Sequence, residues 1–335
     1  MTSLRIRIFT ALFCISIVIF GGQAWASGHA AAGPCPARPA IANELQAGKY
    51  NKTIAVLQQE LTGNPDDAQA ALWLARSYLD VGQYDQAVNF AERAVSLSPQ
   101  CSESHFWLAR SYGIKAERTR SFWLARKSKE EYQTAVRLNP DNLEARRDLM
   151  EFYLEAPWIL GGSKDKAWGQ VKAIASRNAM EGDLARAEYW RDLNKPALAA
   201  QEYRKVMAAK PQHAEAYFQV ADFYESASNP DEVEAATRAA SLIVPGDPRL
   251  DYYSAVASVM KGQSLAKAEH DLKAYLVKSP PRDDFPSHAA AHDWLARIYE
   301  KWGKNQEAIG QYREALQLSP DNAAAHDALR RLDAN

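Results

Sequence analysis

The strongest constraint on the fold is one stretch, Ala289 to Asn322, in which two helix-length apolar patterns flank a glycine-bearing turn at Gly303. The apolar residues recur at helical spacing on both sides of that glycine. They are Leu295, Ile298 and Tyr299 before it, and Ala308, Ile309, Tyr312, Ala315, Leu316 and Leu318 after it. Pro320 closes the second helix, because proline cannot extend one. Neither helix buries its apolar face alone, so the unit must stack on copies of itself.

Helix-ending prolines mark further copies upstream. They are Pro65, Pro99, Pro140, Pro211, Pro245, Pro280 and Pro320. The intervals between them are 34, 41, 71, 34, 35 and 40 residues, and 71 is close to two units of 34. A helix–turn–helix period of this length is that of the tetratricopeptide repeat, which the chain resembles throughout its predicted mature length.

The family pattern of large, small and aromatic residues recurs in register. In residues 289–322 its slots hold His292, Leu295, Ala296, Tyr299, Ala308, Tyr312, Ala315 and Pro320. In residues 68–101 they hold Ala71, Leu74, Ala75, Tyr78, Ala87, Ala91, Ala94 and Pro99, and in residues 214–247 Tyr217, Val220, Ala221, Tyr224, Val233, Thr237, Ala240 and Pro245. Small residues let the helices approach closely, and bulky residues fill the gaps between them.

We therefore predict an all-α fold, the right-handed superhelix of a tetratricopeptide α-solenoid. Residues 27–39 form a flexible N-terminal segment, and residues 40–67 form a degenerate first repeat. About seven repeats follow in residues 68–322, at 68–101, 102–142, 143–179, 180–213, 214–247, 248–282 and 289–322. Residues 323–335 form a capping helix that covers the apolar flank of the last repeat.

The first 26 residues have the pattern of a signal peptide. Arg5 and Arg7 precede the uncharged apolar run Ile8 to Phe20, and Ala24-Trp25-Ala26 predicts cleavage after Ala26. The alternative is an uncleaved anchor, but the run is well short of the roughly 20 residues that span a bilayer. No lipoprotein signal surrounds Cys14 or Cys35, so we expect a soluble protein exported to the periplasm.

The charge balance and the cysteines narrow the partners and the redox chemistry. Loss of Arg5 and Arg7 reduces the 40 basic residues to 38 against 41 acidic ones, which argues against nucleic acid as a partner. Cys35 and Cys101 form a possible disulfide in a compartment that permits one. They lie about two repeats apart, so the bond requires the N-terminal segment to fold back. Two inert or intermolecular thiols are the alternative.

No motif indicates catalysis, a cofactor or a metal. His105, His292 and His326 each occupy the fourth slot of a unit, where the family places a packing residue. His288 and His292 are spaced for a metal, with Asp293 alongside, but no third ligand is placed. The run Gly161 to Lys164 departs from a phosphate loop, and Ser163 is better interpreted as the N-cap of a helix over 164–175.

Two enlarged turns are the main irregularity. Gly113 to Lys127 and Ala156 to Lys166 fall at the same point of consecutive repeats, so both are expected at one edge. The second contains Trp158, Ile159 and Leu160 and is too apolar for a free loop. Either these residues fold back onto Phe122 and Trp123, or they form a docking site for a protein. The pair of insertions resembles a subgroup of exported bacterial tetratricopeptide proteins, a resemblance that carries no activity with it.

The other candidate surface is the groove that the family lines with first helices. Its slots hold Arg76, Phe106 and Arg110 toward the N-terminus, and acidic residues in the middle. The candidate contact residues, with the second enlarged turn included, are Arg76, Phe106, Arg110, Glu151, Glu155, Trp158, Ile159, Glu188, Asp192, Phe218 and Asp222. Such a groove suits an extended peptide with a charge pattern of its own. Alternatively, the charges only keep an open surface soluble.

The predicted function is a non-catalytic periplasmic scaffold or adaptor. It binds a protein or peptide through the concave groove and the enlarged turns, with Phe106, Phe218 and Tyr252 as aromatic anchors. The first alternative is a carrier of a small ligand or lipid, which requires an enclosed pocket. The second is an enzyme with an unrecognised site, although no segment is left over for a catalytic domain.

Overall fold

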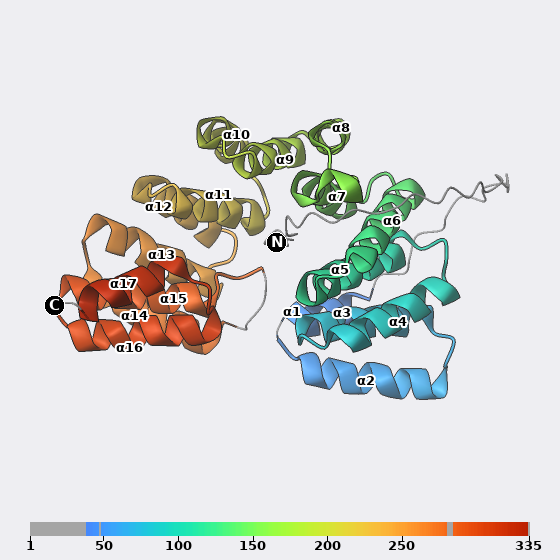
Figure 1. Ribbon diagram of the computed structural model, residues 1–335, viewed down its shortest axis with the longest axis horizontal. Coiled ribbons are helices and arrows are strands. Elements are labelled where there is room, and N and C mark those ends of the chain that lie inside the picture. The colour runs from blue at the N-terminus through green and yellow to red at the C-terminus, as the bar shows by residue number, and fades with distance from the viewer. Residues whose placement is uncertain (1–37, 47, 280–283, 334–335) are drawn as a thin grey trace. The chain divides into compact units, whose positions relative to one another are not determined.

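The computed structural model describes residues 38–46, 48–279 and 284–333, and within these ranges the chain is built of α-helices without a strand (Figure 1). The predicted all-α architecture of stacked helical hairpins is confirmed. The helices group into two compact units, one that ends at Ala185 and one that begins at Arg186. The predicted signal peptide, Cys35 and most of the predicted flexible segment lie outside the described residues.

The first unit contains four hairpins and the start of a further helix. Its helices are α1 (Pro39–Gln46), α2 (Tyr50–Gly63), α3 (Ala68–Asp80), α4 (Tyr84–Leu97), α5 (Ser102–Thr119), α6 (Phe122–Leu138), α7 (Leu143–Glu155), the 3₁₀ turn η1 (Trp158–Leu160) and α8 (Lys164–Ala175). Helix α9 (Ala179–Asp192) contains the boundary between the units.

The second unit continues the same alternation. Its helices are α10 (Pro196–Ala209), α11 (Ala214–Ser226), α12 (Pro230–Ser241), α13 (Pro248–Lys261), α14 (Leu265–Lys278), α15 (His288–Lys301), α16 (Asn305–Leu318) and α17 (Ala323–Asp333). The first helices α3, α5, α7, α11, α13 and α15 each pack against the second helix of their own hairpin and against the second helix that precedes them.

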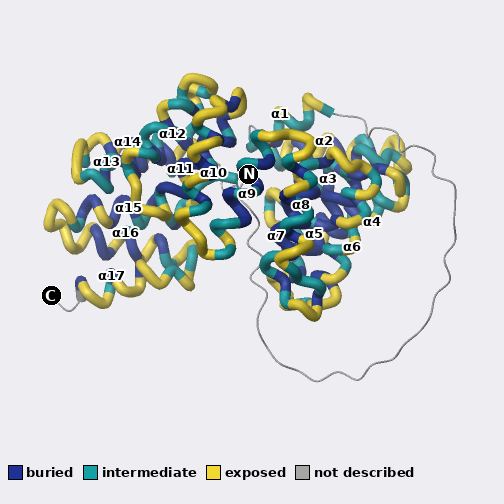
Figure 2. Tube along the Cα trace, turned by 90° about the horizontal axis from the view of Figure 1, so that it is seen from above, coloured by how far each residue is buried: buried dark blue, intermediate teal, exposed yellow. Residues whose placement is uncertain are grey.

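Small residues make these close contacts possible. In the hairpin of α3 and α4, Ala71, Ala75 and Ala87 are fully buried, and Tyr78 stacks on Phe90 with ring centroids 5.5 Å apart. The buried positions follow the facing sides of the paired helices throughout each unit (Figure 2). An alanine leaves room for the neighbouring backbone, and the aromatic pair fills the volume beside it.

The recurring prolines that the structure describes, which leaves out Pro280, lie in the turns between hairpins rather than in the helices. Helix α16 ends at Leu318, and Asn322 then donates its backbone N–H to Ser319 O at 3.1 Å, which places Pro320 second in a four-residue turn. Proline suits this position because its fixed φ matches the turn. Asn322 also accepts a hydrogen bond from the Ala325 N–H, so the same residue that closes the turn caps α17.

The predicted enlarged turn at 113–127 is wrong. Helix α5 continues to Thr119 and α6 begins at Phe122, so the inserted residues lengthen both helices and leave Arg120 and Ser121 as the turn. Arg120 adopts a left-handed φ of 53°, and Ser121 accepts a hydrogen bond from the Leu124 N–H. Ala116 and Leu124 are buried in this extension, so the lengthened parts of α5 and α6 bury apolar side chains of their own.

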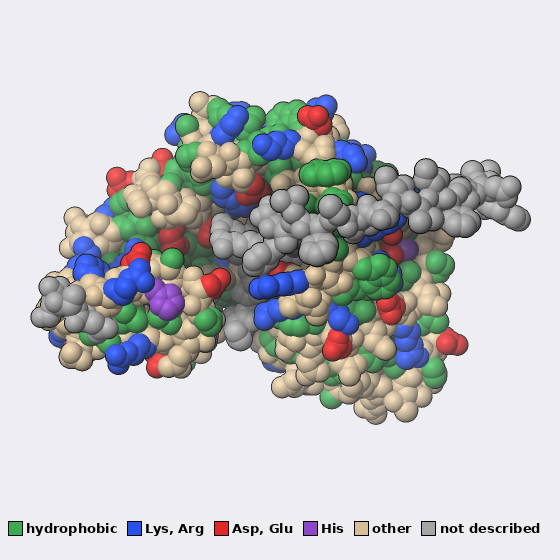
Figure 3. All heavy atoms as spheres, in the orientation of Figure 1, with side chains coloured by type: hydrophobic (Ala, Val, Ile, Leu, Met, Phe, Trp, Pro, Cys, Tyr) green, Lys and Arg blue, Asp and Glu red, His purple; other side chains and the backbone are tan. Residues whose placement is uncertain are grey.

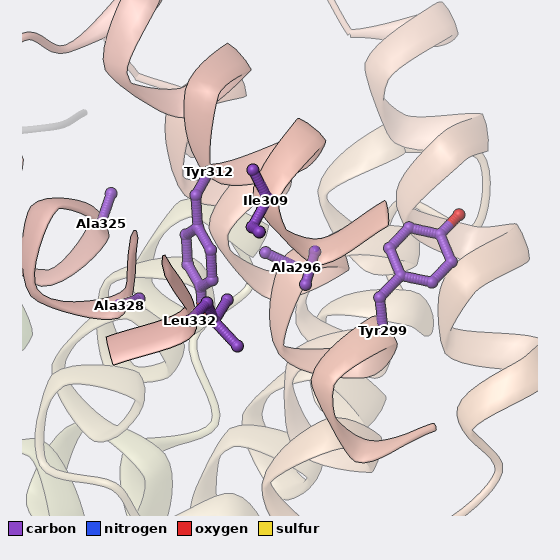
Figure 4. Close-up of a cluster of buried hydrophobic side chains, with 8 residues drawn as sticks. Ala296, Tyr299, Ile309, Tyr312, Ala325, Ala328 and Leu332 are labelled. Atoms are coloured by element: carbon purple, nitrogen blue, oxygen red, sulfur yellow. The ribbon is translucent and has the colours of Figure 1, made fainter. Parts of the chain in front are cut away.

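Helix α17 covers the last hairpin. Its Ala325, Ala328 and Leu332 are buried in one cluster with Tyr312 and Ile309 of α16 (Figure 4). Outside this cluster, Arg331 pairs with Glu300 at 2.6 Å. A single amphipathic helix therefore covers the apolar flank that another repeat would otherwise bury. Within the described part of the chain, no helix is both long and apolar enough to cross a membrane.

Candidate functional site

Three of the residues predicted to line the groove meet in the first unit around Trp107. The Arg76 guanidinium lies 4.8 Å from the centre of the Trp107 ring, and the Arg110 guanidinium lies 5.1 Å from it. Arg110 also lies 4.6 Å from the Phe106 ring. Helices α3 and α5 thus place two cations on one indole, a contact worth about 0.5–2 kcal/mol for each cation. Trp107 was not predicted as part of this surface.

Arg110 is also paired with an acid. Its Nε donates to Asp148 Oδ2 at 2.7 Å, its Nη2 donates to Oδ1 at 3.3 Å, and the Tyr132 hydroxyl donates to the same carboxylate at 3.1 Å. Burial alone would lower the pKa of the Arg110 guanidinium, but Asp148 beside it raises that pKa above its ordinary value. The pair joins α5 to α7, so Arg110 holds consecutive repeats together.

The loop between α7 and α8 separates its three apolar residues. Leu160 is buried, and its carbonyl accepts a hydrogen bond from Lys129 Nζ at 2.8 Å. Trp158 is 84% exposed and Ile159 is 59% exposed, while Phe122 and Trp123 are also exposed. Of the three apolar residues only Leu160 is buried, and the Trp158 and Ile159 side chains are exposed to solvent. The predicted contact of this loop with Phe122 and Trp123 stays a prediction.

This loop is held in one conformation by its backbone. A Cβ atom on Gly162 would lie 1.7 Å from Ala156 O, so only glycine fits there. The Ser163 N–H donates to Tyr153 O at 2.7 Å, and the Ser163 side chain accepts from the Lys166 N–H. Ser163 is thus the predicted N-cap of α8, and the exposed Trp158 lies on a rigid support.

The acidic candidates are divided between the units. Glu151 and Glu155 lie on α7 of the first unit, and Glu188, Asp192 and Asp222 lie in the second. Glu151 and Glu188 are buried, whereas Asp222 is exposed and Asp192 accepts from Arg191 at 3.2 Å.

The predicted aromatic anchors are buried. The exposed fractions of Phe106, Phe218 and Tyr252 are 0%, 3% and 1%. Phe218 stacks on Tyr253 with centroids 6.0 Å apart, and the Arg249 guanidinium lies 3.9 Å from the Phe218 ring. These side chains make packing contacts in the structure, and their contact with a partner stays a prediction.

Two of the three fourth-slot histidines contact the preceding turn. Nε2 of His105 lies 3.0 Å from Pro99 O, and Nε2 of His326 lies 3.0 Å from Pro320 O. His292 instead contacts Gln311 Oε1 at 2.8 Å through Nδ1, and His288 contacts Ser279. Among the described residues no group of three His, Cys, Asp or Glu is placed to hold a metal. At His105 and His326 this position therefore supplies a polar contact to the carbonyl of the preceding turn.

Cys101 immediately precedes α5 and is disulfide-bonded. Its predicted partner, Cys35, lies outside the described residues, so the pairing of these two cysteines stays a prediction.

The second unit contains a pocket that the sequence did not predict as a site. It has a volume of about 710 Å³ and lies between the C-terminal ends of α11 and α13, the start of α12, and α15. Glu225, Asp293, Trp294 and Arg297 contribute its polar lining, and Met260 contributes part of its apolar wall. Nothing local in the sequence joins Glu225 to Trp294.

Glu225 lines this pocket and accepts two side-chain hydrogen bonds. Its Oε1 accepts the Tyr252 hydroxyl at 2.7 Å and the Trp294 indole N–H at 2.7 Å. Desolvation raises the pKa of the Glu225 carboxyl to about 7, although both hydrogen bonds oppose that rise. Glu225 therefore changes its charge near neutral pH.

Positive and negative side chains are interspersed on the visible face of both units (Figure 3). A mixed surface of this kind favours selective contact with a polypeptide over general attraction to a polyanion.

Comparison with known proteins agrees with the repeat pattern. Residues 44–112 and residues 258–323 each match a family model of the tetratricopeptide repeat. No curated protein matches the chain in sequence.

Solved structures with the same architecture extend over more of the chain. The crystal structure of the APC/C hetero-tetramer Cut9–Hcn1 is similar over 87% of this chain and 48% of its own, with 18% identity and a TM-score of 0.53. Yeast Tom70 is similar over 86% of this chain and 59% of its own, with 15% identity and a TM-score of 0.56. The chain thus spans about half the length of the first of these relatives. At these identities the likeness shows the fold alone.

Proposed function

Because the chain is a tetratricopeptide repeat protein, whose fold is that of a protein-interaction scaffold, we propose that it is a non-catalytic periplasmic scaffold or adaptor for a polypeptide partner. The partner contacts the first-helix faces of the repeats and the loop over 156–163. In the first unit those faces carry the Arg76–Trp107–Arg110 cluster.

The observation that carries this proposal is the exposure of Trp158 on a rigid loop. A tryptophan that is 84% exposed forgoes the hydrophobic stabilisation of burial, which is worth about 1.5–3 kcal/mol for a large apolar side chain. Gly162 and Ser163 fix the backbone of the loop around it. Exposed aromatic residues on a fixed support are typical of binding hot spots.

Site-specific photo-crosslinking in cells tests the proposal. A photoreactive residue at position 158 and another at position 222 should each capture a defined protein that mass spectrometry identifies. Val277 is the matched control, since it is 87% exposed on α14 and is not part of either candidate surface. Capture at 277 equal to that at 158 would show that exposure alone explains the crosslinks.

Trp158→Ala separates binding from folding. The variant should lose most of the captured partner with little change in Tm, because the side chain makes few contacts to lose. If the variant retains its partner and instead loses stability, the docking role of the loop is wrong.

The proposed periplasmic location rests on the signal-peptide pattern of residues 1–26. Fractionation of cells should recover the protein in the periplasm, and N-terminal sequencing should begin at Ser27. Recovery of the full chain in the membrane fraction would instead support the uncleaved anchor.

The alternative of a ligand carrier is favoured by one observation, the pocket in the second unit. Its lining includes Glu225, Asp293 and Arg297, and such charged groups disfavour a lipid tail. A small polar ligand that co-purifies with the protein would support this alternative.

A further inference from the structure

The pocket in the second unit presents carboxylate oxygens that lack donors. Both donors at Glu225 reach Oε1, which leaves Oε2 without a hydrogen bond from any described residue. Asp293 Oδ2 accepts from Asn322 Nδ2, whereas Asp293 Oδ1 is shielded from solvent and has no partner in the described part of the chain. A shielded acceptor such as Asp293 Oδ1 normally has a hydrogen-bond partner.

The pKa values of the carboxyl groups in the pocket lead to the same conclusion. Desolvation raises the pKa of Asp293 as well as that of Glu225, and the nearby Asp222 carboxylate adds to the effect at Glu225. Each raised pKa means that the ionised carboxylate is destabilised where it lies. A cation in the pocket would compensate both groups.

The basic side chains that line the pocket are exposed to solvent. Arg297 is exposed, and its guanidinium lies 4.2 Å from the centre of the Trp294 ring. Lys301 is likewise exposed at the rim. Glu300 already accepts from Arg331 at 2.6 Å and from the Tyr312 hydroxyl at 2.6 Å. The carboxylates of Glu225 and Asp293 are therefore the groups in the pocket that can accept a further hydrogen bond.

We propose that this pocket receives a lysine or arginine side chain of the partner polypeptide, with its cationic head at Glu225 and Asp293 and its stem against Val259 and Met260. Basic side chains suit such a recess because an aliphatic stem packs on apolar wall while the charged head reaches the acids. The inference rests on the proposed polypeptide-binding function and specifies which side chain of the partner is recognised.

Titration with defined peptides tests the proposal on the full mature protein. The probes are an acetylated, amidated lysine-rich pentapeptide and the same peptide with norleucine or with glutamate in place of lysine. The indole N–H resonance of Trp294, assigned with Trp294→Phe, reports on the pocket because this group bonds Glu225. The lysine peptide should shift the resonance and saturate it, and the norleucine and glutamate peptides should not.

Two variants complete the test. Glu225→Gln keeps the acceptor for Trp294 and Tyr252 but removes the charge, and it should weaken the lysine peptide at least about tenfold. Glu314→Gln, an exposed carboxylate of α16 outside the pocket, should leave the affinity unchanged. Equal weakening in both variants would mean that only the net charge matters, and would overturn the proposal.

Further outcomes separate the sources of the cation. Cadaverine that binds as tightly as the lysine peptide would indicate a free amine instead of a side chain. A Trp294 shift with the glutamate peptide alone would indicate an anion site at Arg297. A partner still captured at position 158 by Glu225→Gln, in undiminished amount, would refute the recognition of a basic side chain while the scaffold function stands.

Discussion

Trp294 donates its indole N–H to the Glu225 carboxylate at 2.7 Å, across 69 positions of the chain. Tyr252, from the hairpin between them, donates to the same oxygen. In a solenoid each repeat mainly contacts its neighbours, so a bond from α11 to α15 couples helices that the repeat pattern leaves apart. One carboxylate thus joins three consecutive first helices of the second unit.

The pH dependence of stability should reveal this carboxylate. The folded pKa of Glu225 is about 7 and its ordinary value is 4.5, so between these values the folded state holds a proton that the unfolded state has released. The stability that Glu225 contributes is present below about pH 4.5 and is lost as the pH rises through 7. Glu225→Gln stays neutral at every pH. Its free energy of unfolding relative to that of the wild type should therefore increase by on the order of 2 kcal/mol between pH 5 and pH 8. Urea unfolding at both pH values measures the difference.

The titratable and charged groups that face Glu225 also influence its pKa. They are Asp222 on its own helix, Tyr252 and Tyr253 on α13, and Asp293 and Arg297 on α15. Because Arg297 opposes the rise in pKa, Arg297→Gln should move the transition to still higher pH. A gain by Glu225→Gln that is the same at pH 5 and pH 8 would contradict the assignment.

Binding of the lysine peptide should strengthen as the pH rises from 6 to 8. The ionised form of Glu225 is the one that attracts a cation. Because the pKa of Glu225 is about 7, this form becomes dominant only above about pH 7. Bound cation lowers that pKa, so calorimetry at pH 7 in buffers of different ionisation enthalpy should show proton release. Proton uptake on binding would contradict this account.

Gly162→Ala should destabilise the first unit, whereas Gly169→Ala should not. An added Cβ would lie 1.7 Å from Ala156 O at Gly162, which forces the loop to rearrange, and a cost of about 2–4 kcal/mol is expected. Nothing lies within 4 Å of a Cβ at Gly169, inside α8, where alanine favours the helix by about 0.5–1 kcal/mol. Thermal unfolding of the two variants, with far-UV circular dichroism, provides the comparison.

Asp148→Asn should lower the free energy of unfolding by about 2–4 kcal/mol. The change leaves the Arg110 guanidinium between Phe106 and Trp107 without its counter-charge. Glu130→Gln removes the partner of Arg126 in a pair whose side chains are 70% and 50% exposed, and should change stability by less than about 0.5 kcal/mol. Similar losses in both variants would show that the Arg110 pair is no stronger than a surface pair.

Much of the fold was predictable because its signals are local. Ser163 accepts from a backbone N–H three residues later, and Pro320 lies in a turn closed by residues next to it, so both features are readable from short windows. The insertion at 113–127 was misinterpreted because a longer repeat predicts extra residues but not their conformation. Whether they loop out or extend α5 and α6 depends on the packing of Ala116 and Leu124.

The candidate sites were predictable only in part. Arg76, Phe106 and Arg110 occupy slots that recur with the repeat, so their meeting on one face followed from the period. The exposure of Trp158 beside the burial of Leu160 did not follow, because one 3₁₀ turn decides which side chain faces α6.

The sequence by itself determined the hairpins of this protein, their order and the capping helix, since helix periodicity, small-residue slots and turn chemistry act over a few residues. Only the tertiary structure decided that Tyr252 and Trp294 both donate hydrogen bonds to Glu225. The three residues come from three different hairpins, and their approach depends on how each hairpin is rotated on the next. Packing between hairpins of the second unit sets that rotation. The charge state of Glu225 near pH 7 follows from that approach, because burial of the carboxyl raises its pKa.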